Sequence, residues 1–303
     1  MKLAEFNRFD SNYTFLNHGS FGAIPNQVKE KQLEMMELRE KNPNKFIQIT
    51  QYELIEEARR ALATFLGSDY EDIIFVENVS KGFSNILRSL TLAPGEALLI
   101  YTHTYGAMKD SAQAMVDRSN GSELLNLDLP FPIESPDDVI SLFDEMLTNH
   151  TNIKIAILDH IAQPGILFPI QELVDVCKSH GVLTVVDGAH APGHVDLDLE
   201  ELGADFYIGT LYKWLFGPHG SSFQWVAERY HSIVQPAVTS FGYGSPYPEN
   251  FRQQGTRDPI PFIVMPTAID FFESFGGRVR AVSWLTSSPF SGCVLACSEC
   301  VSG

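Results

Sequence analysis

The chain has 303 residues, of which 44% are hydrophobic, and this is enough apolar material for one large α/β domain or two smaller ones. Acidic residues outnumber basic ones by 38 to 21, and the net charge of −17 argues against nucleic acids and anionic membranes as partners, because both attract cationic patches. The first ten residues do not resemble a secretory or mitochondrial signal, and no apolar stretch is long enough to span a bilayer, so we expect a soluble cytoplasmic protein.

Apolar residues at helical spacing predict helices over residues 26–41 and 52–66, and Gly67 is placed to end the second helix. Farther along, short apolar runs alternate with helical patterns, which is typical of strands buried on both faces. The predicted strands cover residues 73–76, 97–101, 153–158, 183–186 and 205–208, and the predicted helices between them cover 80–90, 107–118 and 170–180. Residues 241–261 are expected to form an ordered loop, followed by a helix over 266–277.

This order predicts an α/β fold with a mostly parallel sheet and helices on both faces, and such sheets bind ligands at the carboxyl ends of their strands. Polar and aromatic residues follow all five predicted strands, so we expect them to converge on one site. In strand order they are Asn78, Val79 and Ser80; His103, Thr104 and Tyr105; His160; Asp187 and His190; and Thr210, Tyr212 and Lys213.

Lys213 lies among apolar side chains and leads into a turn at Gly217, which suits a lysine that forms a Schiff base. At the usual lysine pKa of about 10.4, only about 0.04% of the amine is uncharged at neutral pH. Such a lysine therefore needs burial or a nearby cation to lower its pKa, and Leu211, Trp214 and Phe216 can provide the burial. The alternative is a surface lysine beside a turn.

Asp187 ends an apolar run upstream of Lys213 and is suited to hold a protonated pyridine nitrogen, so the two residues together indicate pyridoxal phosphate (PLP). The facing cation would keep Asp187 ionised. Ala189 is small enough for the cofactor ring to lie on, and His190 can hydrogen-bond the ring's phenolic oxygen. The alternatives are a strand-end aspartate that caps a turn and a core histidine whose hydrogen bonds are satisfied.

Residues 77–82 connect a predicted strand to a predicted helix, and backbone N–H groups at a helix N-terminus bind anions. Ser80 adds a hydroxyl, so phosphate binding is predicted here, with Ser80 as a simple helix N-cap as the alternative. Thr210 and Tyr212 are further candidates for contacts with phosphate oxygens.

His103 and Tyr105 follow the strand over residues 97–101, where an aromatic ring can stack on a cofactor or an acid can protonate a leaving group. The sequence does not choose between the two residues, and ordinary packing is the alternative.

The four cysteines predict neither a disulfide framework nor a metal site. Cys177 falls on a predicted helix. The others, Cys293, Cys297 and Cys300, stand at the very end, with no fold after them to house a cluster.

Together these residues resemble the class V aminotransferase family of PLP enzymes, in the branch of isopenicillin N epimerase-like proteins and cysteine desulfhydrases. The motifs run in the family's order over roughly residues 10–280, and the ordered set is more specific than any single motif. They are residues 15–22, Asn78-Val79-Ser80, residues 103–107, residues 187–190, Tyr212-Lys213-Trp214 and residues 254–258.

The resemblance implies a fold-type I homodimer with PLP as cofactor, an amino acid as substrate and active sites at the subunit interface. It places Asn17, His18 and Gly19 near the substrate. It also implies that Gly255 and Thr256 reach the phosphate of the partner subunit's cofactor. Turn formation, which the glycines favour, is the alternative for both segments.

Two features depart from the family's pattern. Residues 159–165 lack the hydroxyl pair that relatives usually carry before the proline. Residues 281–303 form a divergent cysteine-rich tail where relatives continue into a small domain with a carboxylate-binding arginine, and Arg252 and Arg257 are the candidates to substitute for that arginine. We therefore expect residues 1–25 near the active site, a large PLP-binding domain over 26–265, and a truncated start of the small domain with the tail over 266–303.

The main hypothesis is a PLP enzyme acting on an amino acid, either a C–S lyase of the cysteine desulfhydrase type or an isopenicillin N epimerase-like epimerase. Both reactions begin with removal of the α-proton by Lys213. A desulfurase is disfavoured because it needs a reactive cysteine on a mobile loop, and a dehydrogenase because no G-x-G-x-x-G follows the first strand. The alternative is a catalytically impaired truncated isoform that binds PLP or only dimerises.

Overall fold

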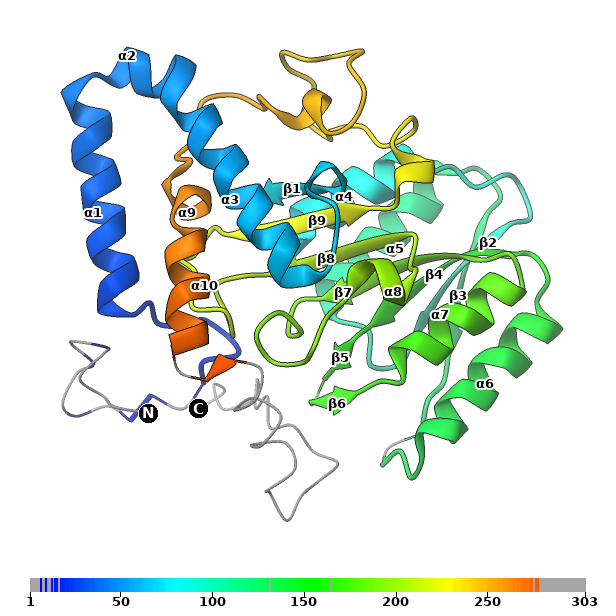
Figure 1. Cartoon of the computed structure of the whole chain (residues 1–303). Helices are drawn as coiled ribbons and strands as arrows, with labels where there is room; N and C mark the ends of the chain where they lie inside the picture. The colour runs from blue at the N-terminus through cyan, green and yellow to red at the C-terminus, as the bar shows by residue number, and fades with distance from the viewer. Residues whose placement is uncertain are drawn as a thin grey trace.

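The structure, a computed structural model, describes residues 17–130, 132–163, 165–274 and 276–277, together with residues 6, 9, 12, 14 and 15. A seven-stranded sheet lies between two layers of helices (Figure 1). Its strand order is β1-β9-β8-β7-β4-β2-β3, and β9 runs antiparallel to both of its neighbours while the other pairs are parallel. The predicted mostly parallel α/β fold is therefore confirmed.

The strands of this sheet are short, and their bounds place the predicted site residues at one edge. The bounds are β1 Ile73–Val76, β2 Ala97–Tyr101, β3 Glu123–Leu127, β4 Ile153–Asp159, β7 Leu183–Gly188, β8 Phe206–Thr210 and β9 Ser222–Val226. A separate antiparallel hairpin joins β5 (Ile161–Ala162) to β6 (Ile166–Leu167). Because six of the seven strands run the same way, the carboxyl ends of β1, β2, β4, β7 and β8 meet at the same edge.

Alternating side chains divide the interior into two apolar cores, one on each side of the sheet. In β1, Ile73 and Phe75 enter one core while Ile74 and Val76 enter the other. The first core is covered by α1 (Asn26–Lys41), α3 (Gln51–Leu66), α6 (Pro136–Asn149), α7 (Ile170–Ser179), α8 (Leu199–Leu202), α9 (Ile260–Ile263) and α10 (Met265–Ser274). The second is covered by α4 (Val79–Ser89) and α5 (Gly106–Arg118), on the opposite side of the sheet (Figure 1).

Short elements complete the described chain. They are α2 (Pro43–Lys45), a π-helical segment (Phe46–Thr50) and 3-10 turns at Tyr70–Asp72, Glu228–Tyr230 and Glu249–Phe251. None of the helices in the described ranges is both long and apolar enough to cross a membrane.

The predicted helices and strands are present, with ends that shift by a few residues at most. Gly67 ends α3 in the left-handed region with φ of 61°, as predicted. The start of α4 was predicted differently, because Asn78 and not Ser80 is the N-cap: its side-chain oxygen accepts the Lys81 N–H at 2.9 Å. The predicted helix over 266–277 ends at Ser274 as α10.

Among the longer elements of the described chain, β3, α6 and β9 were not predicted. β3 is an edge strand whose Glu123 and Asn126 face solvent, so it has no continuous apolar run. β9 contains the buried polar residues Ser222 and Gln224, which interrupt its apolar pattern. The start of α6 carried a readable signal, since Ser135 caps the helix and a proline follows it.

The domain division stays a prediction. α10 packs against α3 and α1 and contributes Met265, Ala268 and Phe272 to the first core. Leu16, Pro164 and residues 281–303, with the three clustered cysteines, lie outside the described residues.

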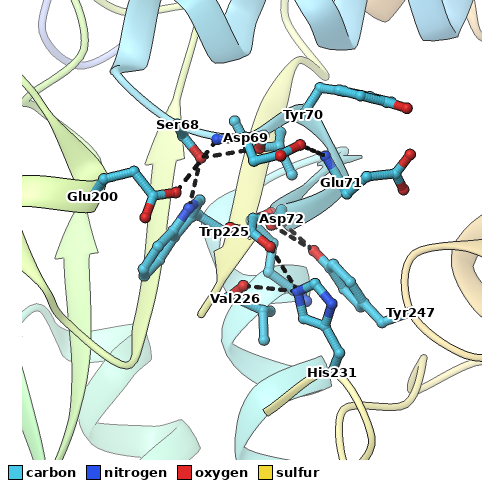
Figure 2. Close-up of polar contacts among 12 residues, drawn as sticks. Ser68, Asp69, Tyr70, Glu71, Asp72, Glu200, Trp225, Val226, His231 and Tyr247 are labelled. Atoms are coloured by element: carbon cyan, nitrogen blue, oxygen red, sulfur yellow. Dashed lines mark hydrogen bonds and ion pairs between the residues drawn. The ribbon is translucent and has the colours of Figure 1, made fainter. Parts of the chain in front are cut away.

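Polar contacts join the segment before β1, residues 68–72, to β9 and to Tyr247 of the loop over residues 241–261 (Figure 2). The Trp225 indole N–H donates to the Ser68 hydroxyl at 2.7 Å, and the Tyr247 hydroxyl donates to the Asp72 carbonyl at 3.0 Å. The His231 Nε2 lies 2.9 Å from the Asp72 Oδ1. These contacts hold the first strand, which leads directly into the predicted phosphate-binding segment.

Asp72 is the titratable group in this network whose ionisation opposes folding. Burial raises the pKa of Asp72 to about 7, and the negative charges of Glu200, Asp69 and Glu228 act in the same direction. The folded protein therefore binds this proton more tightly than the unfolded chain does. The stabilising effect of the proton is present at low pH and is lost as pH rises from about 4 through about 7.

Replacement Asp72→Asn should flatten the decline in thermal stability between about pH 5 and about pH 8, with its most favourable effect at the higher pH. The amide keeps an acceptor for His231 but has no proton to lose. Thermal unfolding followed by circular dichroism at both pH values measures the effect. Asp144→Asn is the matched control, because Asp144 also pairs with a histidine but is largely exposed. A larger loss of stability for Asp72→Asn at high pH than at low pH would contradict the account.

Candidate active site

A cavity of about 450 Å³ opens at the carboxyl ends of β1, β4, β7 and β8. It brings together most of the residues that the sequence predicted for one site. The predicted residues that line it are Asn17, Gly19, Asn78, Val79, Ser80, Tyr105, Asp187, His190, Thr210, Tyr212 and Lys213. Residues from five separate regions of the chain therefore face one space, as the parallel sheet requires.

Lys213 is the amine of this cavity. Its Nζ lies 2.9 Å from the His190 Nε2. Burial lowers the pKa of Lys213 to about 8, against an opposing effect of the Asp187 carboxylate. About a tenth of the amine is then uncharged at neutral pH, roughly two hundred times the fraction in an ordinary lysine. Lys213 thus has the desolvation that a nucleophilic lysine needs.

His190 is neutral, and its contacts indicate which ring nitrogen carries the proton. Burial lowers the pKa of His190 to about 3, and the charges of Lys213 and His194 lower it further. The Trp214 indole N–H points at the His190 Nδ1 at 3.4 Å, so Nδ1 is the acceptor and Nε2 carries the hydrogen. An Nε2–H can pair with Lys213 only if the lysine offers a lone pair, and the arrangement therefore favours the uncharged amine.

The Asp187 carboxyl lies near the carboxyl end of β7 and is buried, with 4% of the residue's surface exposed. Burial raises the pKa of Asp187, whereas the Ala189 N–H, which donates to Oδ1 at 2.9 Å, and the Lys213 charge both lower it. A cation placed in the cavity would act in the same direction as Lys213 and hold the carboxylate ionised.

The segment over residues 17–22 packs directly on the lysine turn. A Cβ on Gly19 would lie 2.7 Å from the Trp214 ring, and one on Gly22 would lie 2.1 Å from the Tyr212 carbonyl oxygen. Only glycine fits at these two positions, because any side chain would collide with the lysine turn. The close packing between the two segments holds residues 17–22 against the cavity.

The start of α4 and the end of β8 form the side of the cavity predicted for phosphate. Asn78, Val79 and Ser80 line it at the helix N-terminus, where backbone N–H groups and the helix dipole attract anions. The Thr210 hydroxyl donates to the Ala189 carbonyl, which ties the ends of β7 and β8 together. That proton is therefore directed at the backbone and not at a ligand.

Six predicted site residues do not line the cavity, and one of them, Thr104, is buried with its hydroxyl oxygen accepting the Tyr101 N–H at 3.1 Å. His103 is half-buried beside it, and His18 packs behind Trp214 with ring centroids 6.1 Å apart. His160 is a buried histidine whose Nδ1 lies 2.9 Å from the Tyr207 hydroxyl, so it belongs to the core and not to the cavity lining. Gly255 and Thr256 lie on an exposed turn, with Gly255 at φ of 95°.

The two arginines considered for the substrate carboxylate are paired elsewhere. Arg252 contacts Glu249 at 3.0 Å and Arg257 contacts Glu77 at 2.7 Å. Neither lines the cavity.

Several lining residues were missed by sequence reasoning, among them Phe21, Met108, Asp159 and Gln163. Asp159 carried a usable signal, because it directly follows the apolar run of a predicted strand. Phe21 lies in the motif over residues 15–22 but was not singled out, and Met108 carried no signal, since an isolated apolar residue on a helix normally indicates packing. Within the described ranges, no three His, Cys, Asp or Glu side chains are grouped to hold a metal ion.

A model of the aminotransferase class-V family matches residues 23–278, and the chain belongs to that family. Among its relatives, isopenicillin N epimerase of Amycolatopsis lactamdurans is 32% identical over 291 residues, which cover 89% of this chain and 72% of that protein.

The probable chloroplastic L-cysteine desulfhydrase of Arabidopsis thaliana is 29% identical over 301 residues, which cover 92% of this chain. The chain spans 62% of that protein's length. Among solved structures, a lysine-to-alanine mutant of C-DES with glycine covalently linked to its PLP cofactor superposes with a TM-score of 0.83 at 22% identity, covering 96% of this chain and 79% of that one. The superposition shows that the fold is shared.

In limited acetylation of the protein, the extent of modification of Lys213 should rise with pH and reach its midpoint near pH 8, when it is expressed relative to the modification of the exposed Lys41. In Asp187→Asn the midpoint should fall, because the Asp187 carboxylate raises the pKa of Lys213. Peptide mass spectrometry across a pH series measures each lysine separately. A Lys213 midpoint near the ordinary lysine value of about 10.4 would show that the amine is not desolvated.

Proposed function

We propose that the protein is a PLP-dependent enzyme that acts on an amino acid, and that its reaction is a C–S bond cleavage of the cysteine desulfhydrase type. The observation that carries the proposal is the partly buried Lys213 amine, with its lowered pKa, beside a neutral His190 at 2.9 Å. The names of the plant relatives support the choice of substrate. Activity, substrate and partners remain proposals for this chain.

The cavity residues fit the cofactor chemically. Lys213 offers the amine for its aldehyde, and Asp187 offers a carboxylate for the ring nitrogen. Ala189 is a small lining residue that leaves room for the ring, and the N-terminus of α4 at Asn78 to Ser80 offers the anion site for the phosphate. When bound, PLP supplies an electron sink for negative charge at the substrate α-carbon.

The proton chemistry then belongs to the chain's own residues. Lys213 accepts the α-proton at Nζ, since its lowered pKa places it close to the working pH. His190 does not compete for that proton, because its pKa of about 3 keeps it neutral.

Tyr105 is the proposed acid for the leaving sulfur. Of the two sequence candidates, Tyr105 lines the cavity and His103 does not. Tyr105 is 49% exposed at the mouth of the cavity, where its hydroxyl can exchange protons with solvent. It is therefore preferred over His103.

Epimerisation is the second candidate, because the relative from Amycolatopsis lactamdurans is an isopenicillin N epimerase of 32% identity. Epimerisation needs a second base on the opposite face of the substrate and releases no product fragment. Assays for pyruvate and sulfide from cysteine, beside assays for inversion of the α-carbon, separate the two reactions.

Protein purified with PLP should show a visible absorption band and release pyruvate and sulfide from cysteine. Lys213→Ala should lose the visible absorption band of the wild type, because the amine that links the cofactor is gone. The rate should fall at least about a hundredfold, because general-base catalysis is removed. Lys41→Ala, at an exposed position, is the control and should keep both. A folded protein with a band but no turnover of any amino acid would favour the catalytically impaired isoform, and a folded protein without a band would contradict the cofactor proposal.

We further propose a homodimer. Phe21, Phe241 and Tyr243 are 70%, 75% and 81% exposed, which is unusual for large aromatic side chains and supports a partner surface. Phe21 also lines the cavity, so a partner that covers it would close the site. Gly255 and Thr256, exposed and outside their own subunit's cavity, are proposed to serve the partner's phosphate site.

Mixing two inactive variants tests this sharing of sites. Lys213→Ala and Gly255→Val should each be impaired as homodimers. Their heterodimer contains one site with an intact lysine and an intact loop from the other chain, so a mixture should regain about a quarter of wild-type activity. No recovery after verified subunit exchange would mean that the loop serves its own subunit or none.

A further inference from the structure

Asp159 and Asp187 end two neighbouring strands at the same level of the sheet. They are register partners in the parallel pair of β4 and β7, where adjacent strands lie about 4.8 Å apart. Each residue is 4% exposed, and both line the cavity that contains Lys213. Two carboxyl groups therefore share one desolvated region beside a single amine, and the proposed function uses only one of them.

Such a pair does not ionise completely. Burial raises the pKa of each carboxyl, and the negative charge of Asp187 raises the pKa of Asp159 further, well above its usual range. Two carboxylates this close in a low-dielectric site retain one proton between them.

The surroundings decide which residue keeps the proton. Asp187 accepts the Ala189 N–H at 2.9 Å and faces the charge of Lys213, and both favour its ionised form. The groups that face Asp159 are the Tyr101 hydroxyl on β2, the distant Lys109 on α5 and the Asp187 carboxylate on β7. The balance of these groups leaves the anion on Asp187.

The contact with Tyr101 also indicates which oxygen carries the proton. Tyr101 is fully buried, and its hydroxyl donates to the Asp159 Oδ2. Oδ2 is therefore the acceptor, and a proton on Asp159 lies on Oδ1.

We propose that Asp159 is a positioning residue that holds the single proton of an Asp159–Asp187 pair, so that the cavity presents one negative charge and Asp159 sets the basicity of Asp187. The shared proton is a property of the protein alone. Its consequence for the ring nitrogen of the cofactor rests on the proposed function.

The pairing has a consequence for the lysine as well. The Asp187 carboxylate already raises the pKa of Lys213 against the effect of burial. A second anion at Asp159 would raise it again and reduce the uncharged amine. A neutral Asp159 thus permits one carboxylate for the ring nitrogen without loss of the nucleophile.

Infrared spectroscopy of the cofactor-free protein tests the shared proton directly. At neutral pH the wild type should show a carbonyl stretch of a buried protonated carboxylic acid that is absent from Asp159→Asn, and a band that Asp159→Asn retains is assigned to Asp72, whose pKa of about 7 leaves it partly protonated. Asp144→Asn, which removes an exposed carboxylate, is the control and should keep the band. If the folded wild type has no such band that Asp159→Asn removes, the proposal is wrong.

The effect on Asp187 is tested by pH titration of the visible band of the PLP-loaded protein. The asparagine of Asp159→Asn is neutral like the protonated acid, and its side-chain N–H keeps a hydrogen-bond donor, so the midpoint of the band titration should match that of the wild type. Asp159→Ala has no such donor and should shift the midpoint by about one pH unit or more. In an Asp187→Asn background the alanine effect should vanish. A shift in Asp159→Asn equal to that in Asp159→Ala, or none in Asp159→Ala, would overturn the role. Failure to bind PLP would refute the proposed function, while the infrared result would still decide the shared proton.

Discussion

The contact between the partly buried Lys213 amine and the neutral His190 is the interaction on which the site depends. An ordinary lysine is a cation at neutral pH and can neither attack an aldehyde nor remove a proton from carbon. Burial lowers the pKa of Lys213 to about 8, and the indole of Trp214 directs the histidine so that a lone pair on the lysine is preferred. The close packing of Gly19 against Trp214 fixes this arrangement from the other side.

The sheet explains why these groups meet. Five parallel strands end at one edge, and the chain places a polar or aromatic residue after each of them. The site is therefore assembled by topology from residues as distant in sequence as Asn17 and Lys213, on strands whose side chains fill two apolar cores. The net charge of −17 does not prevent a local anion site, because the N-terminus of α4 supplies backbone dipoles at that position.

Much of this arrangement could be predicted from sequence, for identifiable physical reasons. Continuous apolar runs specify buried strands, so β1, β2, β4, β7 and β8 were found together with the edge where Asp187 and Lys213 meet. β9 was missed because its buried Ser222 and Gln224 break the pattern, and their hydrogen-bond partners are set only by the tertiary fold. Asp159 carried a local signal as the residue after a predicted strand, but its pairing with Asp187 comes from the register of β4 and β7, which no local pattern reveals. The cytosolic location and the domain division stay predictions.

The central claim is that Lys213 is the residue that binds the cofactor covalently, and one measurement tests it most directly. The protein is loaded with PLP, reduced with borohydride to make the bond permanent, digested and mapped by mass spectrometry. The account predicts a single pyridoxyl modification, on the peptide that contains Lys213. Modification of a different lysine in the folded protein, such as Lys81 in the first turn of α4, would contradict it.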